Sequence, residues 1–320
     1  MFIDTLRNEF DNGLDLIVGG PPCQGFSTSG RRALDDPRNS MVNNFLYAIE
    51  TLSPRAFIME NVTGFTTMQN GAIFLESVDR AVSLGYEVHA AVLLASAYGV
   101  PQRRRRFFLI GIRDGVFEFP RPKSLLKVVG KGQLELDMRP QDLLPGSEVT
   151  FLEATSDLPY IRPGGSSSRY RSEPGNSYQR LMRRGVTFLT EHNSANHSQR
   201  VVDLIRHIPK GSSAFDPDVW SSIPEHLRPT SGFSNCYKRI RANEPSPTIT
   251  RNFTTPSSAN CIHPTASRAL TLREGARCQS FPDSFRFVGS TDERRLQIGN
   301  AVPPLLAESL GRAMIKALSA

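Results

Sequence analysis

The feature that most restricts how this chain of 320 residues can fold is an alternation of apolar runs and amphipathic segments up to about residue 113. Short apolar runs predict buried strands at residues 15–18, 56–59, 86–94 and 107–112. Segments 41–52 and 72–84 lie between these runs and predict helices. Strands that alternate with helices predict an α/β fold on a parallel, doubly wound sheet with helices on both faces.

The composition changes from about residue 119 to residue 230, where proline, glycine and serine are frequent. This change predicts a second, loop-rich domain. The last segment, residues 304–320, carries Leu306, Leu310 and Met314 at helical spacing. It predicts an amphipathic helix that packs back on the first domain.

A cysteine follows the first predicted strand. Residues 20–29 read GPPCQGFSTS, so that Cys23 lies in a rigid Pro-Pro/Gln-Gly turn at the end of a buried strand. Loops at strand ends are where α/β enzymes carry their chemistry. A free cysteine is weak evidence by itself, because most free cysteines are small hydrophobic residues of the core. Its interpretation therefore depends on the other motifs of the chain.

Three further polar motifs lie at the ends of predicted strands or helices. They are Glu60-Asn61-Val62, the QRRRR run at 102–106 and QIGNAVPP at 297–304. In this order, the four motifs resemble the ordered motifs of the cytosine-5 DNA methyltransferases. RALTLREGARCQSFPD at 268–283 is similar to the penultimate motif of that family. The resemblance covers residues 15–112 and 237–318.

The resemblance implies a doubly wound, Rossmann-like sheet of the S-adenosylmethionine-dependent methyltransferases, incomplete at its N-terminus, with a smaller, loop-rich target-recognition domain. We expect the catalytic domain to comprise residues 1–140 and 290–320. The target-recognition domain is expected at residues 141–289.

The implied reaction is methyl transfer to carbon 5 of cytosine, which is too weak a nucleophile until a thiolate adds to carbon 6. The resemblance assigns this attack to Cys23, which a nearby guanidinium or helix N-terminus would hold as thiolate. It implies that protonated Glu60 donates to ring nitrogen 3, which an apolar, water-poor pocket favours. Arg106 would donate to the exocyclic oxygen of the base, and Arg104 would brace the catalytic loop or Glu60. Gln102, Arg104 and Arg106 point to one face if the segment is extended. Arginine runs more often form solvated basic faces, but the place of this run before an apolar strand favours the specific role.

The implied cofactor is S-adenosyl-L-methionine. The residues that match the family's cofactor contacts are Pro22, Met41, Asn300 and Val302. The Phe-x-Gly-x-Gly loop with which family members begin has no match before Asp15. We expect a partial cofactor pocket, and three explanations compete: a late start or truncated fragment, a split enzyme whose partner chain carries the first motifs, or a degenerate gene remnant. The first two are favoured together, because the later catalytic residues are intact.

The implied partner is double-stranded DNA, from which the cytosine must be extruded before attack. Residues 25–39 are small and basic enough for a mobile loop that clamps phosphate. Residues 237–250 resemble the close of the recognition domain. The residues expected at DNA are Gln24, Ser27, Ser29, Arg38 and Thr248.

Composition agrees with a polyanionic partner, since Lys and Arg number 38 against 31 Asp and Glu, for a net charge of +7. The four cysteines show no zinc spacing and no CxxC pair, so we expect no metal and a reduced, cytoplasmic setting. No apolar run approaches the roughly 20 residues of a membrane span.

We therefore expect an enzyme of a restriction-modification or orphan DNA-methylation system. A DNA-binding protein without methyl transfer remains open. A tRNA cytosine methyltransferase is less favoured because of the long variable region, and a cysteine hydrolase using Cys23 is remote because none of the six histidines lies in a comparable motif.

Overall fold

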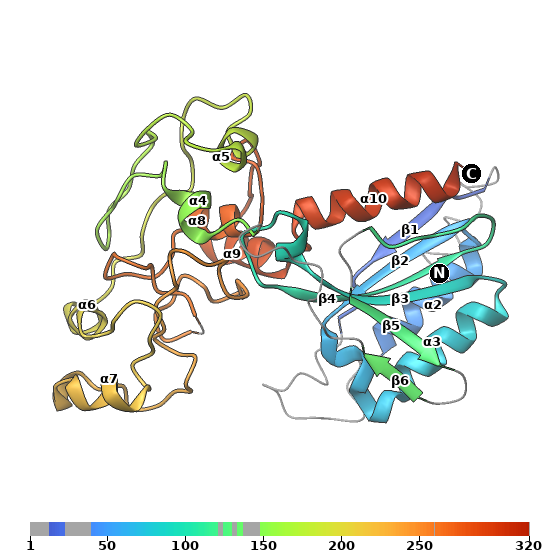
Figure 1. Cartoon of the computed structure of the whole chain (residues 1–320), viewed down its shortest axis with the longest axis horizontal. Helices are drawn as coiled ribbons and strands as arrows, with labels where there is room; N and C mark the ends of the chain where they lie inside the picture. The colour runs from blue at the N-terminus through green and yellow to red at the C-terminus, as the bar shows by residue number, and fades with distance from the viewer. Residues whose placement is uncertain are drawn as a thin grey trace. The chain divides into compact units, whose positions relative to one another are not determined.

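The computed structural model describes residues 13–22, 40–120, 124–129, 133–136, 148–258 and 260–319. The chain divides into two compact units (Figure 1). Unit 1 comprises the described residues within 1–94, 105–142 and 308–320, and unit 2 comprises those within 95–104 and 143–307. These units do not share the boundaries expected for the catalytic domain (1–140 and 290–320) and the target-recognition domain (141–289). That functional division stays a prediction.

Unit 1 is built on a sheet whose six described strands have the order β1-β2-β4-β3-β5-β6. The strands are β1 (Leu16–Gly19), β2 (Ala56–Asn61), β3 (Glu87–Leu94), β4 (Arg105–Ile112), β5 (Ser124–Val129) and β6 (Gln133–Leu136). The first four correspond to the apolar runs that predicted strands. The predicted α/β class is therefore confirmed.

The prediction of a parallel sheet holds only for β1 and β2 among the described strands. Strand β4 is antiparallel to both β2 and β3, and β5 is antiparallel to β3 and to β6. Residues 95–104, between β3 and β4, contain the short 3-10 helix η4 (Ala95–Tyr98). A parallel pair needs a crossover of about a dozen residues or more, so this short connection makes β3 and β4 antiparallel.

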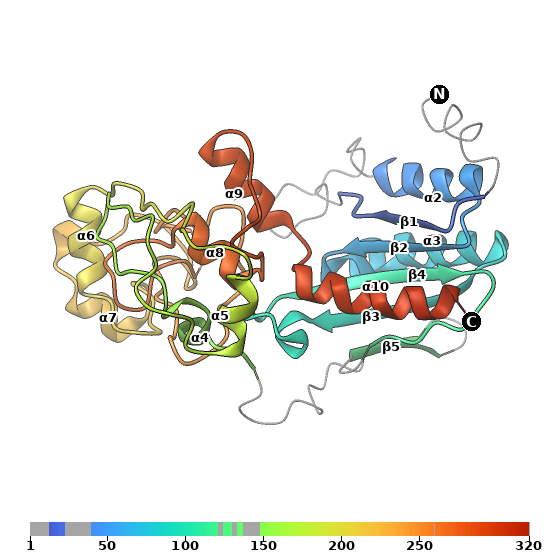
Figure 2. The same ribbon diagram turned by 90° about the horizontal axis from the view of Figure 1, so that it is seen from above.

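Helices cover both faces of this sheet. They are α2 (Ser40–Leu52), the 3-10 helix η3 (Thr63–Gly71), α3 (Ala72–Ser83) and α10 (Pro304–Leu318). Figures 1 and 2 show α10 across the sheet from α2 and α3. In unit 1, the guanidinium of Arg55 donates to the carbonyl of Leu318 at 2.9 Å, which fixes the end of α10.

The alternation of side chains along β2 and β4 explains why both faces need cover. Phe57 and Leu109 point to the face that packs against α2 and α3. On the same face, Phe65 of η3 stacks on Phe107, with the ring centroids 5.4 Å apart. Neighbouring residues such as Ile110 are equally buried on the other face. Because successive side chains of a strand point to opposite sides, a strand that is apolar throughout must be covered twice.

Unit 2 consists mainly of loops and short helices, as its composition predicts. The helices are α4 (Phe151–Thr155), α5 (Ser177–Met182), α6 (Gln199–Arg206), α7 (Pro217–Ser222), η5 (Glu225–Leu227), α8 (Leu272–Cys278) and α9 (Thr291–Asn300). Capping boxes begin α4, α8 and α9, with Thr or Ser at the N-cap and Glu three residues later.

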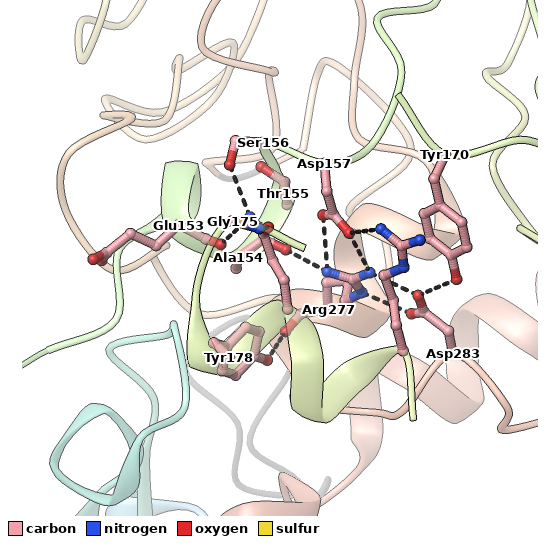
Figure 3. A network of polar contacts seen from close by, with 12 residues as sticks. Glu153, Ala154, Thr155, Ser156, Asp157, Tyr170, Gly175, Tyr178, Arg277 and Asp283 are labelled. Carbon is pink, nitrogen blue, oxygen red and sulfur yellow. Dashed lines mark hydrogen bonds and ion pairs between the residues drawn. The ribbon is translucent and has the colours of Figure 1, made fainter. Parts of the chain in front are cut away.

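Buried ion pairs join the segments of unit 2 (Figure 3). The guanidinium of Arg277 donates to Asp283 at 2.6 and 2.7 Å and to Asp157 at 3.2 Å, and all three side chains are fully buried. The hydroxyl of Tyr170 donates to Asp283 at 2.6 Å. Burial acts to raise the pKa of Asp283, but Arg277 outweighs it and holds that pKa below its usual value. Each buried charge is thus paired, which keeps the cost of its desolvation tolerable.

Candidate active site

Glu60 and Arg106 lie together where β2 ends and β4 begins. Arg106 Nε is 2.8 Å from Glu60 Oε1, and the two side chains are 15% and 18% exposed. Glu60 pairs with Phe108 in the antiparallel register of β2 and β4. Arg106 precedes Phe108 by two positions and so points to the same face. The structure therefore brings together two of the residues predicted to be catalytic.

The turn after β1 runs beside this ion pair. Strands β1 and β2 are parallel with Gly19 opposite Met59, so both strands end at the same edge of the sheet. A Cβ atom on Gly20 would lie 3.1 Å from Glu60 Oε2. Glycine at this position lets the backbone approach the carboxylate closely.

Asn61 holds this turn in place. Its Nδ2 donates to the carbonyl of Pro21 at 3.1 Å, and its Oδ1 accepts from the backbone N–H of Val62 at 2.9 Å. The side chain is 4% exposed. Asn61 belongs to one of the sequence motifs, but no role could be predicted for it because its partner lies 40 residues earlier in the chain. The polar residue directly after a buried strand was the available signal.

Several predicted site residues lie outside the described residues: Cys23, Gln24, Ser27, Ser29 and Arg38. Pro22, which directly precedes Cys23, is described and exposed. Met41, in the first turn of α2, is 41% exposed. Both belong to unit 1.

Exposure alternates along the arginine run, as its spacing predicts. Arg103 and Arg105 are exposed, whereas Arg104 is buried and Arg106 is partly buried. Gln102 and Arg104 belong to unit 2, whereas Arg106 belongs to unit 1. The guanidinium of Arg103 forms ion pairs with Glu148 and Glu244, so this run is more than a solvated basic face.

Arg104 and Gln102 organise a second cluster, inside unit 2. Arg104 donates to the carbonyls of Ile249 and Gly299, each at 2.9 Å. The backbone N–H of Ile249 donates to Gln102 Oε1 at 2.7 Å, and Thr248 Oγ1 donates to the carbonyl of Arg103 at 3.2 Å. The run 102–104 thus fixes the segment that holds Thr248. The expected role of Arg104, bracing the catalytic loop or Glu60, stays a prediction.

The end of helix α9 belongs to the same cluster. A Cβ atom on Gly299 would lie 2.6 Å from the backbone N and Cα of Arg251. Only glycine allows this close approach of α9 to residues 250–251. Asn300 is exposed and Val302 is partly buried, and both belong to unit 2.

Among the described residues, no group of three or more His, Cys, Asp or Glu side chains is placed to hold a metal ion. None of the helices in the described part of the chain is long and apolar enough to cross a membrane.

Comparison with known proteins gives consistent matches. The profile of the C-5 cytosine-specific DNA methylase family matches residues 3–316. The chain is 38% identical over 320 residues to the type II methyltransferase M.DdeI of Desulfomicrobium norvegicum, covering 93% of this chain and 71% of that protein. It is 32% identical over 368 residues to the type II methyltransferase M.AgeI of Thalassovita gelatinovora, covering 96% and 84%.

Solved structures show the same fold. One, described as a DNA modification methyltransferase encoded within an E. coli prophage, superposes with a TM-score of 0.70 at 24% identity, over 99% of this chain and 83% of that chain. A DNMT2 of Spodoptera frugiperda superposes with a TM-score of 0.56 at 15% identity, over 98% and 82%.

Proposed function

Because the chain belongs to the C-5 cytosine-specific DNA methylase family, we propose that it methylates carbon 5 of a flipped cytosine in a specific DNA sequence through a covalent adduct with Cys23. The observation that carries this proposal is the ion pair of Glu60 and Arg106 beside the turn that leads into Cys23. Asn61 anchors that turn from the same strand as Glu60.

The chemistry begins with addition. The Cys23 thiolate forms a bond to carbon 6, and the electron pair of the 5,6 double bond moves toward carbon 5. Glu60, in its protonated form, donates a hydrogen bond to ring nitrogen 3 and offsets the developing negative charge. After methylation, loss of the proton from carbon 5 to a base and cleavage of the bond to Cys23 restore the aromatic ring.

Arg106 acts with Glu60 in this scheme. Its guanidinium lies against the carboxylate of Glu60. A proton on Glu60 weakens this ion pair and frees a donor of Arg106 for the exocyclic oxygen of the cytosine. Binding of the base and protonation of Glu60 therefore support each other.

DNA contacts come from both units in this proposal. The family acts on DNA, and extrusion of the base exposes carbon 6 to attack from above the ring. The residues assigned to DNA are Gln24, Ser27, Ser29, Arg38 and Thr248. Thr248 is supported by its position, because its neighbour Ile249 is buried and doubly hydrogen-bonded, which fixes the segment that meets the nucleotide.

The family's cofactor is S-adenosyl-L-methionine, which supplies the methyl group. The groups present fit it. Pro22 and Met41 offer exposed apolar surface in unit 1, and Asn300 offers an exposed amide in unit 2. Val302, the fourth residue assigned to the cofactor, is partly buried.

Further cofactor contacts come from outside the described residues, either from the same polypeptide or from a second chain. This proposal is supported by strand β1, which is the terminal strand of the sheet among the described residues. Its Val18 is 65% exposed, although strands of this apolar composition are usually covered on both faces. A strand edge with an exposed apolar side chain favours pairing with another segment.

The relatives named as type II methyltransferases favour a restriction-modification or orphan methylation system, with cytoplasmic action on nucleoid DNA. The second candidate is a DNA-binding fragment or subunit that is catalytically incomplete. This alternative is favoured, when the chain acts alone, by exposed Val18 on β1, which has no second partner strand among the described residues.

The test is labelled methyl transfer from S-adenosylmethionine to mixed-sequence DNA, by the chain alone and then with the encoded upstream segment or the neighbouring gene product added. A parallel assay uses DNA in which 5-fluorocytosine replaces cytosine, because fluorine at carbon 5 cannot leave as a proton does and the adduct accumulates. We expect a denaturant-stable adduct with the native chain and none with Cys23→Ser. Transfer that survives Cys23→Ser would remove Cys23 from the mechanism, and DNA binding without transfer under any condition would favour the binding-only alternative.

A further inference from the structure

Two fully buried glutamines, Gln102 and Gln279, form a chain of hydrogen bonds through unit 2. The backbone N–H of Ile249 donates to Gln102 Oε1 at 2.7 Å. Gln102 Nε2 donates to Gln279 Oε1 at 2.8 Å, and Gln279 Nε2 donates to the carbonyl of Ile298 at 2.7 Å. Both side chains are 0% exposed. This chain joins the backbone at 249 to the backbone at 298.

Arg104 makes a second bridge between the same two segments. Its guanidinium, also buried, donates to the carbonyl of Ile249 and to the carbonyl of Gly299. The backbone N–H and carbonyl of Ile249 are thus connected to the carbonyls of Ile298 and Gly299, which are consecutive residues near the end of α9. The close approach of Gly299 to Arg251 adds direct backbone contact beside the two bridges.

The residues next to the bridged peptides are the ones assigned to ligands. Thr248 precedes Ile249 and is assigned to DNA, whereas Asn300 follows Gly299 and is assigned to the cofactor. We propose that Gln102 and Gln279 are positioning residues, which hold these two segments at a fixed spacing and thereby couple DNA binding to cofactor binding. This inference rests on the proposed function, because it takes both ligand assignments from it.

The chemistry of the bridge suits this role better than that of an ordinary core contact. Apolar side chains of similar volume would fill the same space, but they would leave the amide of Ile249 and the carbonyl of Ile298 unpaired. Amide hydrogen bonds are directional, so a fully satisfied buried pair specifies one relative position of the segments that it joins. A shift of the backbone at residue 249 is therefore opposed by its connection to residue 298, and a shift at residue 298 is opposed by its connection to residue 249.

Gln279→Met tests the proposal, with Gln179→Met as the matched control. Gln179 is also buried in unit 2, and its side chain makes three hydrogen bonds: with Glu153, Ser156 and Gly175. It contacts neither bridged segment through these bonds. Both substitutions remove a buried amide from the same unit, so both should lower stability. Only Gln279→Met should alter the coupling between ligands.

The first readout is the factor by which mixed-sequence duplex DNA tightens S-adenosylmethionine binding at equilibrium, measured on the chain in the form that binds both ligands. We expect a factor of about 5 or more for the native chain and for Gln179→Met. We expect the factor to approach 1 for Gln279→Met. By reciprocity, S-adenosylmethionine should tighten DNA binding by the same factor in each variant, which checks the measurement internally.

The second readout is hydrogen exchange of the amides at residues 297–302, which needs DNA alone. DNA should slow this exchange in the native chain and in Gln179→Met, and should not slow it in Gln279→Met. Gln279→Glu, which keeps the acceptor for Gln102 and loses the donor to Ile298, replaces Gln279→Met if that variant does not fold.

Two results would overturn the proposal. One is a folded Gln279 variant that loses as much stability as Gln179→Met but keeps the native coupling between the two ligands and the native protection from hydrogen exchange. The other is the absence of coupling in the native chain. Failure of the proposed function is recognised separately, by the loss of DNA binding or of methyl transfer in the native chain.

Discussion

Arg106 Nε lies 2.8 Å from Glu60 Oε1, across the antiparallel pair of β2 and β4. The two residues are 46 positions apart in the sequence, and the register of the two strands places them on one face. The contact joins a side chain at the end of one buried strand to a side chain at the start of another. It places a carboxyl group and a guanidinium side by side, and the proposed function assigns both to one cytosine edge.

Glu60→Gln preserves the size of the side chain and a hydrogen-bond donor, but it removes the acidic proton that Glu60 would supply at ring nitrogen 3. We expect methyl transfer to fall by about 10²- to 10⁴-fold, the usual contribution of a general acid. Single-turnover transfer of labelled methyl groups measures this effect. Glu50→Gln is the control, since Glu50 forms an ion pair with Arg80 at the surface of unit 1 and should leave transfer unchanged. Equal rates for the two variants would exclude Glu60 as the acid.

Asn61→Asp should loosen the turn that leads into Cys23. The aspartate keeps an acceptor for the N–H of Val62 but loses the donor to the carbonyl of Pro21. Misplacement of a reacting group by about 1 Å can cost about 10²-fold in rate, so we expect methyl transfer to fall by roughly one to two orders of magnitude. DNA affinity, measured by filter binding, should change by about threefold or less, because Asn61 is buried and is not itself among the residues assigned to DNA. A similar loss in both measurements would contradict a local role for Asn61.

Arg277→Met should destabilise the protein strongly. It leaves the buried carboxylates of Asp157 and Asp283 without their shared partner, and breaking a buried pair in this way costs about 3–5 kcal/mol. Arg206→Met is the control, because its ion pair with Asp203 is largely exposed and worth at most about 1 kcal/mol. Urea unfolding monitored by circular dichroism gives both free energies. A loss below about 1 kcal/mol for Arg277→Met would show that the network is dispensable.

Stability should fall as the pH is lowered from about 6.5 to about 4, partly through His263. Burial lowers the pKa of His263 from 6.5 to about 4, and the charge of Arg268 acts in the same direction, whereas the nearby Glu274 acts to raise it. The unfolded chain therefore binds this proton at a higher pH than the folded chain, so unfolding is favoured increasingly through that window. The full difference corresponds to about 3 kcal/mol.

His263→Asn should flatten this pH dependence. The Nδ1 atom of His263 accepts from the backbone N–H groups of Thr265 and Ala266, and an asparagine oxygen is suited to accept in its place. His192 and His197, whose pKa values burial also lowers, should leave a smaller dependence of the same sign. Urea unfolding at pH 7.5 and pH 5 compares the two proteins. If the free energy of unfolding fell equally in both proteins between pH 7.5 and pH 5, His263 would not contribute to the pH dependence.

Gly299→Ala and Gly311→Ala should have opposite effects. At Gly299 the new methyl group would lie 2.6 Å from the backbone of Arg251, whereas at Gly311 no atom lies within 4 Å. We expect a loss of about 1–3 kcal/mol at Gly299, as for overpacked sites, and a gain of about 0.5–1 kcal/mol at Gly311, which lies inside helix α10. Thermal unfolding measures both. A neutral Gly299→Ala would mean that α9 can shift away from residues 250–251.

Local patterns in the sequence determined β1 to β4 and the helices α2, α3 and α10, and the motifs supplied the set of residues proposed for the chemistry. The apolar runs became β1 to β4, and alternation along the arginine run correctly separated exposed Arg103 and Arg105 from less exposed Arg104 and Arg106. These features depend on periodicity and on neighbouring residues, which a sequence displays directly.

The tertiary structure decided the direction of β4, the partners of Glu60, Arg104 and Arg106, and the contacts of residues such as Asn61 and Gln279. Pairing of Glu60 with Arg106 depends on strand register, and the bridge from Ile249 through Gln102 and Gln279 to Ile298 depends on loop packing. Such contacts join residues that are distant in sequence, and their geometry is fixed only when burial requires each polar group to find a partner. The sequence alone therefore determined which residues are proposed for the chemistry, and the folded chain decided which of the described ones lie together.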